Sequence, residues 1–369
     1  MRAKDFIPKP YQNTKIEGKV TWSSPSNIAL VKYWGKREPQ LPENPSISFT
    51  LSNCKTITTL GYSKRENDGK FSFEVVLDGE KKDAFKPKIE TFFNRVEAYL
   101  PFLKDYHFKI ETQNTFPHSS GIASSASGMS ALALCLMSIE QTLVAPHDTP
   151  GGGQGAYDES YFFKKASFLA RLGSGSACRS VEGPLVVWGT HDKIVGSSDL
   201  FGVTYPFEVH PNFSNYQDVI LLVDKGEKQV SSSVGHNLMR DHPFARERFH
   251  QAHNHLTALK EIFKEGNLEA FIGIVEREAL TLHAMMMTSM PYFILMKPNT
   301  LKIINAIWSF RAKTGLKVCF TLDAGANVHV LFPENETKQV LEFINNELVA
   351  YCENGNYICD QIGYGAKKL

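Results

Sequence analysis

Residues 114–143 read NTFPHSSGIASSASGMSALALCLMSIEQTL, a turn of small residues that opens directly into a helix. Pro117 and Gly121 interrupt regular structure in the first part, whereas small residues and leucines dominate the second. The first N–H groups of a helix lack partners within it, and the helix dipole is positive there. The segment therefore predicts a phosphate site, with the hydroxyls of Ser124 and Ser125 available to phosphate or Mg²⁺. Close helix packing with the serines as N-caps explains the composition equally well.

The rest of the chain mixes strand and helix patterns without a strict alternation. Alternating and β-branched residues predict short strands separated by loops within 21–60, strands at 71–79 and 107–114, and a strand pair at 181–189. Apolar spacing predicts helices at 86–103 and from the N-cap Asp158 to about residue 172. After a polar connector at 206–216, strands are expected at 218–225, 316–323 and 326–332, and helices at 244–263, 267–288, 300–314 and 336–352. This order predicts an α+β fold with two domains of two layers each, 1–212 and 213–369.

Composition and charge argue against a nucleic-acid-binding, membrane or secreted protein. The 369 residues include 40 Lys and Arg against 39 Asp and Glu, a formal net charge of +1. Because this balance gives no global basic field, we expect neither a nucleic-acid nor a membrane partner. The longest apolar run, 131–137, is far shorter than the roughly 18 residues that span a membrane. The first ten residues lack the apolar core of a signal peptide and the cysteines are dispersed, so a cytoplasmic protein with reduced thiols is expected.

A second segment, NIALVKYWGKR at 27–37, combines cations with aromatic residues. Three cations, Lys32, Lys36 and Arg37, lie in a stretch from 21 to 37 that contains no acid. A bend near Trp34 and Gly35 would wrap the ammonium groups around an anion such as phosphate. A solvated basic strand end is the simpler reading, but the interleaved Tyr33 and Trp34 indicate a partly buried edge.

Two further segments carry polar groups beside glycines. RLGSGSACRS at 171–180 offers Ser174, Ser176 and Arg179, which suit a diphosphate or a carboxylate, although a helix that ends at Gly173 explains part of it. TLDAGANV at 321–328 presents Asp323 after a strand, where a carboxylate can act as a general base or serve only as a turn residue.

The remaining patterns are weaker evidence for a functional site. The histidines at 250, 253 and 255 form HxxHxH in an expected helix, where only two share a face, so an ordinary helix surface is the better reading than a metal site. The glycine-rich stretch 147–156 follows a polar loop instead of a strand, so we interpret it as a solvent loop. No GxxxxGK[ST] motif occurs, so the expected phosphate site is not a P-loop.

In this order the four segments resemble the GHMP kinase superfamily and, within it, the diphosphomevalonate decarboxylase family. NIALVKYWGKR resembles the substrate motif and FPHSSGIASSASG the phosphate-binding loop of that family. RLGSGSACRS resembles its diphosphate-contacting segment and TLDAGANV its catalytic aspartate segment. The resemblance runs from about residue 20 to about residue 335.

The resemblance implies a GHMP kinase fold, with two α/β sandwich domains and an active site in the cleft between them. It implies ATP-dependent decarboxylation of mevalonate 5-diphosphate to isopentenyl diphosphate in isoprenoid biosynthesis, with ADP, phosphate and CO₂ as the other products. ATP and Mg²⁺ would be required, and the protein would be a homodimer.

The resemblance also implies roles for individual residues. Asp323 would orient or deprotonate the tertiary hydroxyl, with Lys32 beside it, while Arg179 and Asn27 would hold the substrate carboxylate. Substrate contacts would include Tyr33, Trp34, Lys36, Ser174, Ser176, Arg179 and Lys228. ATP contacts would include Pro117, Gly121, Ala123, Ser124, Ser125 and Ser127, with Ser125 also on the metal.

Three alternatives stay open at this point. The first is a decarboxylase of the monophosphate, although Tyr33, Lys36 and the serines at 174 and 176 favour the diphosphate. A small-molecule kinase of the same superfamily would stop at phosphorylation, although the combination of Asp323, Lys32 and Arg179 argues against it. A catalytically silent protein of this fold would bind ligands without turning them over.

Overall fold

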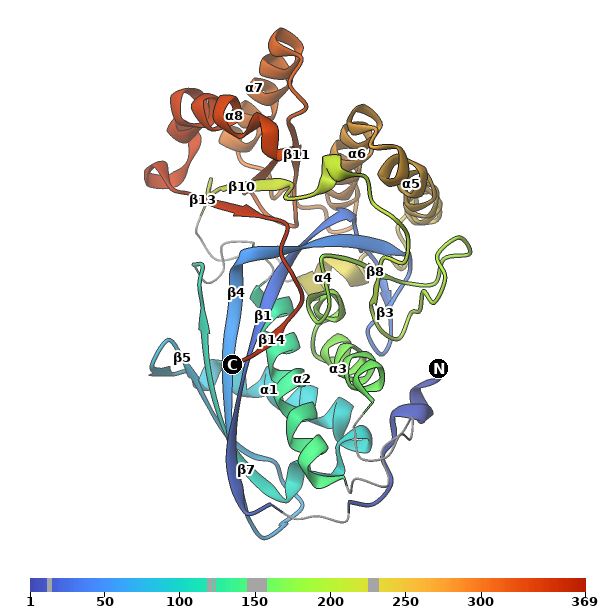
Figure 1. The fold of residues 1–369 in the computed structure, drawn as a ribbon, viewed down its shortest axis with the longest axis vertical. Coiled ribbons are helices and arrows are strands. Elements are labelled where there is room, and N and C mark those ends of the chain that lie inside the picture. The colour runs from blue at the N-terminus through green and yellow to red at the C-terminus, as the bar shows by residue number, and fades with distance from the viewer. Residues whose placement is uncertain (12–14, 118–121, 123, 145–157, 225–231) are drawn as a thin grey trace.

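The structure, a computed structural model, describes residues 1–11, 15–117, 122, 124–144, 158–224 and 232–369. Two β-sheets, one in each half of the molecule, are each packed against helices (Figure 1). The mixture of helices and sheets agrees with the expected α+β class. The N-terminus and the C-terminus both lie beside the first half (Figure 1).

The first sheet is built around three antiparallel strands, β1 (Glu17–Val31), β4 (Ser46–Lys64) and β7 (Tyr106–Asn114). Five further strands complete this sheet: β5 (Ser72–Leu77), β6 (Glu80–Lys81), β8 (Leu185–Trp188), β9 (Val203–Thr204) and β14 (Lys367–Lys368). The order of the strands is β14-β1-β4-β7-β5-β6, and in addition β8 pairs with β4 and β9 pairs with β8. Helices α1 (Lys86–Val96), α2 (Ser124–Leu143) and α3 (Glu159–Gly173) pack on this sheet. Their shared core includes Trp22, Leu60 and Phe108 from the strands and Phe93 and Leu136 from the helices. A separate hairpin consists of β2 (Lys36–Arg37) and β3 (Leu41–Pro42).

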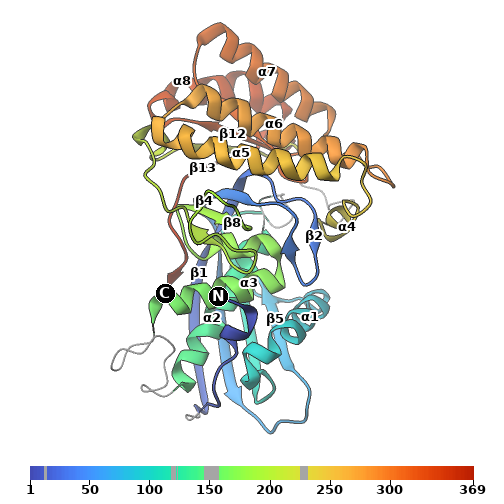
Figure 2. The same ribbon diagram turned by 90° about the vertical axis from the view of Figure 1, so that its right-hand side faces the viewer.

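The second sheet is antiparallel, with the order β11-β12-β10-β13. Its strands are β10 (Gln217–Leu221), β11 (Cys319–Thr321), β12 (Val328–Phe332) and β13 (Tyr357–Gln361). The helices of this half are α4 (Ser232–Asn237), α5 (Ala245–Glu265), α6 (Leu268–Met287), α7 (Pro298–Thr314) and α8 (Thr337–Phe343). Figure 2 shows α5 and α6 side by side along one flank, with α7 and α8 above them.

Short 3₁₀ turns connect many of these elements, at Ala3–Phe6, Asp83–Phe85, Glu97–Tyr99, Pro101–Lys104, Gly175–Ser180, Pro211–Phe213, Glu334–Glu336, Val349–Tyr351 and Glu353–Gly355. The helices expected at 86–103 and 336–352 are therefore shorter than predicted. The first continues as 3₁₀ turns after Val96, and the second as a π-helix at Ile344–Leu348 followed by a 3₁₀ turn. The expected strand pair at 181–189 is the single strand β8.

The prediction of short strands with loops within 21–60 was wrong, because β1 and β4 are long and continuous. Pro25 sits at a register shift of β1 against β4, where proline costs no ladder hydrogen bond. In β4 the N–H groups of Ser52, Asn53 and Cys54 donate to the buried carboxylate of Asp360 at 2.9, 2.8 and 2.7 Å. Asp360, more than 300 positions away in sequence, thus accepts the N–H groups of β4 where β4 is not paired with β1.

The two halves share apolar packing. One buried cluster unites Leu30 of β1 and Phe49 of β4 with Ile220 of β10, Leu256 of α5 and Phe271 of α6. After β13 the chain returns to the first sheet, where β14 pairs with β1. The sequence patterns predicted neither β13 nor β14. The division into 1–212 and 213–369 stays a prediction.

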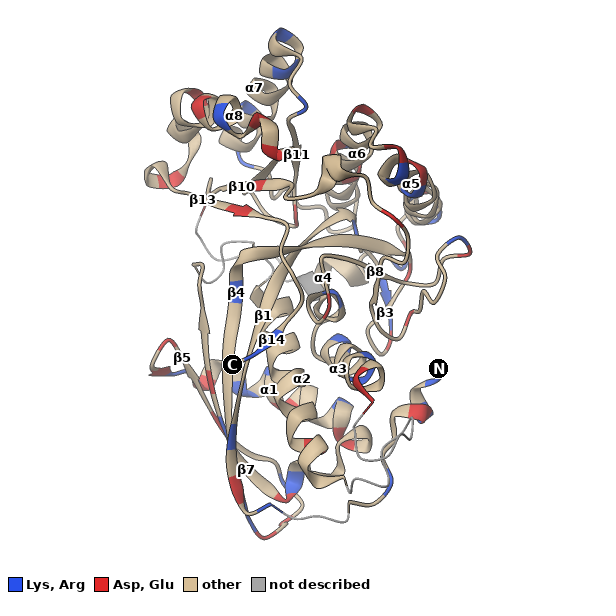
Figure 3. Cartoon of the chain, in the orientation of Figure 1, with Lys and Arg blue, Asp and Glu red and all other residues tan. Residues whose placement is uncertain are grey.

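Charge and polarity over the surface agree with the balanced composition. Figure 3 shows basic and acidic residues interspersed over both halves of the described chain. Among the described helices, none has both the length and the apolar character needed to cross a membrane. All six cysteines are free thiols, and all but Cys359 are buried.

Candidate active site

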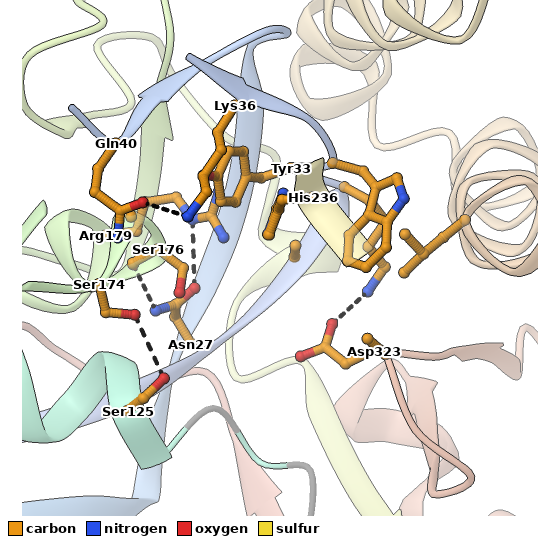
Figure 4. A pocket seen from close by; sticks show the side chains of 16 residues that line it. Asn27, Tyr33, Lys36, Gln40, Ser125, Ser174, Ser176, Arg179, His236 and Asp323 are labelled. Carbon is orange, nitrogen blue, oxygen red and sulfur yellow. Dashed lines mark hydrogen bonds and ion pairs between the residues drawn. The ribbon is translucent and has the colours of Figure 1, made fainter. Parts of the chain in front are cut away.

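A pocket between the two halves brings together most of the residues singled out from the sequence (Figure 4). Ten predicted site residues line it: Asn27, Lys32, Tyr33, Trp34, Lys36, Ser125, Ser174, Ser176, Arg179 and Asp323. They come from the end of β1, the β2 hairpin, the start of α2, the 3₁₀ turn after α3, and the turn between β11 and β12. All four chemistry-bearing segments therefore converge on one cavity.

The predicted bend after β1 is present at Gly35. Its φ of +97° lies in a region that residues with a side chain rarely adopt, and an added Cβ would come within 3.0 Å of the Phe249 ring. The Gly35 N–H donates to Nδ1 of His236 at 3.0 Å. Burial, together with the cations Lys36 and Arg179, lowers the pKa of His236 to about 3, so the imidazole is neutral. This turn carries the chain from the buried Lys32 to the basic hairpin that begins at Lys36.

The centre of the pocket is an ion pair between the two halves of the chain. Nζ of Lys32, whose side chain is 2% exposed, lies 3.0 Å from Oδ1 of Asp323, whose side chain is 27% exposed. Burial lowers the pKa of the Lys32 ammonium, and the charge and hydrogen bond of Asp323 oppose that change. The carboxylate of Asp323 therefore holds a desolvated cation in place while its own partly exposed side faces the cavity (Figure 4).

Arg179 and Asn27 lie next to this ion pair. Nε of Arg179 donates to Oδ1 of Asn27 at 3.4 Å, and its Nη1 donates to the Ser46 hydroxyl. The Asn27 amide in turn donates to Oγ of Ser180 at 2.7 Å and to the carbonyl of Ser176 at 3.3 Å. Burial lowers the pKa of the Arg179 guanidinium, which nevertheless stays charged at neutral pH because arginine titrates so high. Arg179 makes no ion pair in the described part of the chain, so its charge is available to a ligand carboxylate.

The far end of the pocket is basic and rich in hydroxyls. Nζ of Lys36 donates to Oε1 of Gln40 at 2.8 Å, and burial lowers its pKa. Ser174 and Ser176 flank Gly175, where an added Cβ would lie 2.9 Å from both Trp188 and the Tyr33 hydroxyl. The glycine thus lets the serine turn approach the Tyr33 ring closely.

The phosphate-loop residues are only partly placed here. Ser125 lines the pocket, and its hydroxyl lies 3.4 Å from that of Ser174 (Figure 4). Ser124 begins α2 and is partly exposed, whereas Pro117 is exposed and does not line this pocket. Ser127 is fully buried and hydrogen bonds to Thr56 at 2.6 Å. Gly121, Ala123 and Lys228, and the 147–156 loop, lie outside the described residues.

Several contacts were not predicted from the sequence. Gln40 and His236 line the pocket, and Asn44 donates to the Lys32 carbonyl at 2.9 Å. Gln40 follows Lys36 by four residues in a short hairpin, a local signal that could have identified it. His236, by contrast, reaches Gly35 across 201 positions of sequence, which no local pattern indicates. Through this hydrogen bond to the backbone, His236 supports the turn at Gly35.

Three potential metal ligands meet outside the pocket, where His253 of the HxxHxH run lies within 4.8 Å of His191 and Asp192, counted between ligand atoms. Both ring nitrogens of His191 are already occupied: Nδ1 accepts the Lys193 N–H and Nε2 faces the His253 carbonyl, each at 3.1 Å. The rings of His191 and His253 stack with centroids 4.0 Å apart, so their in-plane lone pairs do not converge. His255 instead bonds to Glu278. We assign no metal to this cluster.

Two family models match this chain. The diphosphomevalonate decarboxylase-like N-terminal domain covers residues 24–200, and the mevalonate 5-diphosphate decarboxylase C-terminal domain covers residues 218–363. The chain belongs to the diphosphomevalonate decarboxylase family. Both halves of the pocket lie in matched regions, with Lys32 and Arg179 in the first and Asp323 in the second.

Individual members of this family are similar along nearly the whole chain. The diphosphomevalonate decarboxylase of Gibberella zeae is 29% identical over 341 residues, which cover 88% of this chain and 83% of that protein. A solved structure described as MDDEF in complex with MVAPP, AMPPCP and magnesium has a TM-score of 0.78 and 27% identity, covering 96% of this chain and 99% of that one. The mevalonate diphosphate decarboxylase from Staphylococcus aureus has a TM-score of 0.78 and 26% identity, covering 96% and 98%. The expected α+β GHMP kinase fold is thereby confirmed.

Proposed function

We propose that this protein catalyses the ATP-dependent decarboxylation of mevalonate 5-diphosphate to isopentenyl diphosphate, releasing ADP, phosphate and CO₂. The observation that carries the proposal is the ion pair between the buried Lys32 and the partly exposed Asp323, which shares one pocket with Arg179 and with the basic, hydroxyl-rich end at Lys36. Membership of the decarboxylase family and the MVAPP and AMPPCP bound to a similar structure support the same reaction.

Asp323 would act on the tertiary hydroxyl of the substrate. A tertiary alcohol is a poor nucleophile, and a carboxylate within hydrogen-bond reach can orient it or accept its proton. The ammonium of Lys32, 3.0 Å from Oδ1, favours the ionised carboxylate that this task needs. The same ammonium would neutralise charge on the phosphoryl group during transfer.

Arg179 and Asn27 would hold the carboxylate that leaves as CO₂. A guanidinium and an amide N–H are both donors, and both line the cavity near Asp323. Phosphorylation turns the hydroxyl into a good leaving group, and its departure leaves cationic character on the carbon. The electrons of the breaking carbon–carboxylate bond then form the new double bond. A carboxylate held in a fixed orientation is what this elimination requires.

The diphosphate would bind at the other end, where Lys36, Ser174, Ser176 and the Tyr33 hydroxyl gather around Gly175. Lysine and hydroxyl donors suit phosphate oxygens. Trp34 would contribute by packing, since its buried ring lies against His236 with centroids 4.6 Å apart. Lys228 would add a further cation to the same phosphates.

ATP and Mg²⁺ would bind at the wall that the start of α2 forms. Ser125 in the first turn of α2 offers a hydroxyl beside the first N–H groups of the helix, which have no partner within the helix. A hydroxyl oxygen is a hard donor of the kind that Mg²⁺ prefers. Ser124, Pro117, Gly121 and Ala123 would complete the phosphate loop, whereas the buried Ser127 would support it through its hydrogen bond to Thr56. Mg²⁺ bound with ATP would offset the charge of its phosphates.

The decisive experiment incubates the protein with MgATP and either mevalonate diphosphate or the monophosphate, and measures CO₂ and ADP separately. Equal release of CO₂ and ADP with the diphosphate is the expected result. ADP without CO₂ would indicate a kinase that stops at phosphorylation. Turnover with the monophosphate alone would move the substrate assignment, and neither product would indicate a silent binding protein.

We also propose a cytoplasmic homodimer without nucleic-acid or membrane partners. Six free thiols suit a reducing compartment, and a net charge of +1 gives no field for polyanions. Sedimentation of the purified protein across a range of concentrations tests the dimer, and fractionation of the source cells tests the location. A single monomeric species at all concentrations would contradict the first proposal.

A further inference from the structure

Helix α6 touches the backbone of both members of the central ion pair. Lys32 and Asp323 are 291 positions apart in sequence, so the 3.0 Å between Nζ and Oδ1 depends on how their backbones are held. Glu278 of α6 accepts the N–H of Lys32 through Oε2 at 2.9 Å. His283, five residues further along α6, lies with Nε2 3.2 Å from the carbonyl oxygen of Asp323.

The Glu278 contact is rigid because its carboxylate is itself fixed. Glu278 is fully buried, and Arg248 of α5 donates Nη1 to Oε1 at 3.0 Å and Nη2 to Oε2 at 2.5 Å. His255 approaches Oε1 at 2.5 Å from the same helix. Although burial alone would raise the pKa of Glu278, these partners hold it below its ordinary value.

Arg248 also holds the other side of the Lys32 peptide. Its Nη2 donates to the Lys32 carbonyl at 3.0 Å, so the N–H and the C=O of one residue are bonded to a single buried network. Asn44 donates to the same carbonyl at 2.9 Å. The backbone of Lys32 therefore has little freedom to move relative to α5 and α6.

The His283 contact has a defined direction. A carbonyl oxygen can only accept, so Nε2 of His283 must carry the proton and donate it to Asp323. The imidazole is 1% exposed, and burial lowers its pKa to about 4, which keeps it neutral at pH 7. The turn that presents Asp323 is closed on its other side by the Gly325 N–H, which donates to the same carbonyl at 2.7 Å.

We propose that Glu278 and His283 are positioning residues for catalysis, which use one helix to set the separation of Lys32 and Asp323. Neither would touch substrate. Each acts through the backbone of a residue that does, so loss of either contact lets the ammonium and the carboxylate drift from reacting distance. The inference rests on the proposed function and adds the elements that make the site work.

The test compares variants of His283, His242 and Glu278 by steady-state kinetics and thermal unfolding. His283→Leu removes the donor, whereas His283→Gln keeps a donor near the position of Nε2. His242→Leu is the matched control, because His242 is also buried and its Nε2 lies 3.1 Å from a backbone carbonyl, that of Met285. In the described chain His242 makes its hydrogen bonds to Met285, Thr288 and Phe244, and none to Lys32 or Asp323.

We expect His283→Leu to lower kcat about 10- to 100-fold, the scale that small misplacements of catalytic groups cost, with KM for both substrates within about twofold of wild type. His283→Gln should recover most of kcat, and His242→Leu should lose thermal stability without losing kcat. Glu278→Gln keeps an oxygen for the Lys32 N–H, so it should keep most of kcat although the weaker Arg248 pair lowers its stability. Glu278→Leu removes that oxygen and should lower kcat as His283→Leu does. A kcat for Glu278→Leu equal to that of Glu278→Gln would refute the role of Glu278.

The outcomes separate this inference from the function it rests on. A wild-type protein that releases no CO₂ refutes the proposed function, whatever the variants do. An active wild type with normal kcat in His283→Leu refutes the positioning role. An equal loss of kcat in His283→Leu and His242→Leu, or a rise in KM alone, also overturns it, because either pattern reports general destabilisation or substrate binding.

Discussion

Replacement of Asp323 by Asn is the most informative perturbation of the pocket. The change preserves the shape of the side chain but removes the charge that lies 3.0 Å from Nζ of Lys32. Positioned general bases contribute about 10²- to 10⁴-fold, so kcat should fall by at least about 10²-fold, equivalent to roughly 3 kcal/mol in the barrier. Binding of ATP should be largely intact, because Asp323 is not needed to hold the nucleotide.

The same substitution has a calculable effect on stability. Removal of one member of a fully buried ion pair costs about 3–5 kcal/mol. Asp323 is 27% exposed, and water partly screens the pair, so we expect a smaller loss of about 1–3 kcal/mol in the free energy of unfolding. The pKa of Lys32, which burial already lowers, should fall further when its counter-charge is gone.

The assay measures CO₂ and ADP release, ATP binding by calorimetry, and unfolding in denaturant. Asp360→Asn is the matched control, since Asp360 is a buried carboxylate that accepts three N–H groups of β4 and does not line the pocket. It should lose stability without a comparable loss of kcat. Near-normal turnover of Asp323→Asn would refute the reasoning, as would equal losses of kcat in both variants.

Three further predictions concern other charged groups. Lys36→Met should raise KM for the diphosphate substrate about 10- to 100-fold, the value of one charge-assisted hydrogen bond, with little change in kcat in steady-state assays. The pKa of His236 is about 3 in the folded protein against an ordinary 6.5, so the protein becomes less stable as pH falls below 6.5. His236→Asn keeps an acceptor for the Gly35 N–H but does not titrate. In chemical unfolding, the free energy of unfolding of this variant should fall by about 2 kcal/mol less than that of wild type between pH 7 and pH 5. Lys165→Met, which removes the ammonium 2.6 Å from the buried Glu140 carboxylate, should cost about 3–5 kcal/mol in unfolding experiments while KM stays unchanged. An equal loss of stability between pH 7 and pH 5 in His236→Asn and wild type, or an unaltered KM in Lys36→Met, would contradict these expectations.

The helices were the part of the fold most accessible from sequence. The apolar spacing predicts 267–288 and 300–314, and the structure has α6 at Leu268–Met287 and α7 at Pro298–Thr314. Both follow from interactions between residues three and four apart, which a local pattern records. The long strand β4 was missed, and in its middle three N–H groups donate to Asp360, a distant residue that no local pattern indicates.

The candidate site divides in the same way. Small residues before a helix, cations without acids, and an aspartate after a strand each signal chemistry within about ten residues, so Ser125, Lys32 and Asp323 were identified. Glu278 and His283 lie in an ordinary amphipathic helix, and nothing in its sequence distinguishes them from residues that only pack. Their relation to the site exists only through contacts that span 246 and 40 positions.

The sequence by itself determined the class of fold, the four segments that carry the chemistry and the family to which they belong, because each depends on residue types at short spacing. The tertiary structure alone decided that these segments share one pocket, that Lys32 meets Asp323, and that α6 holds both. Distances between residues hundreds of positions apart depend on how two halves pack around a shared core, and local patterns do not specify that packing.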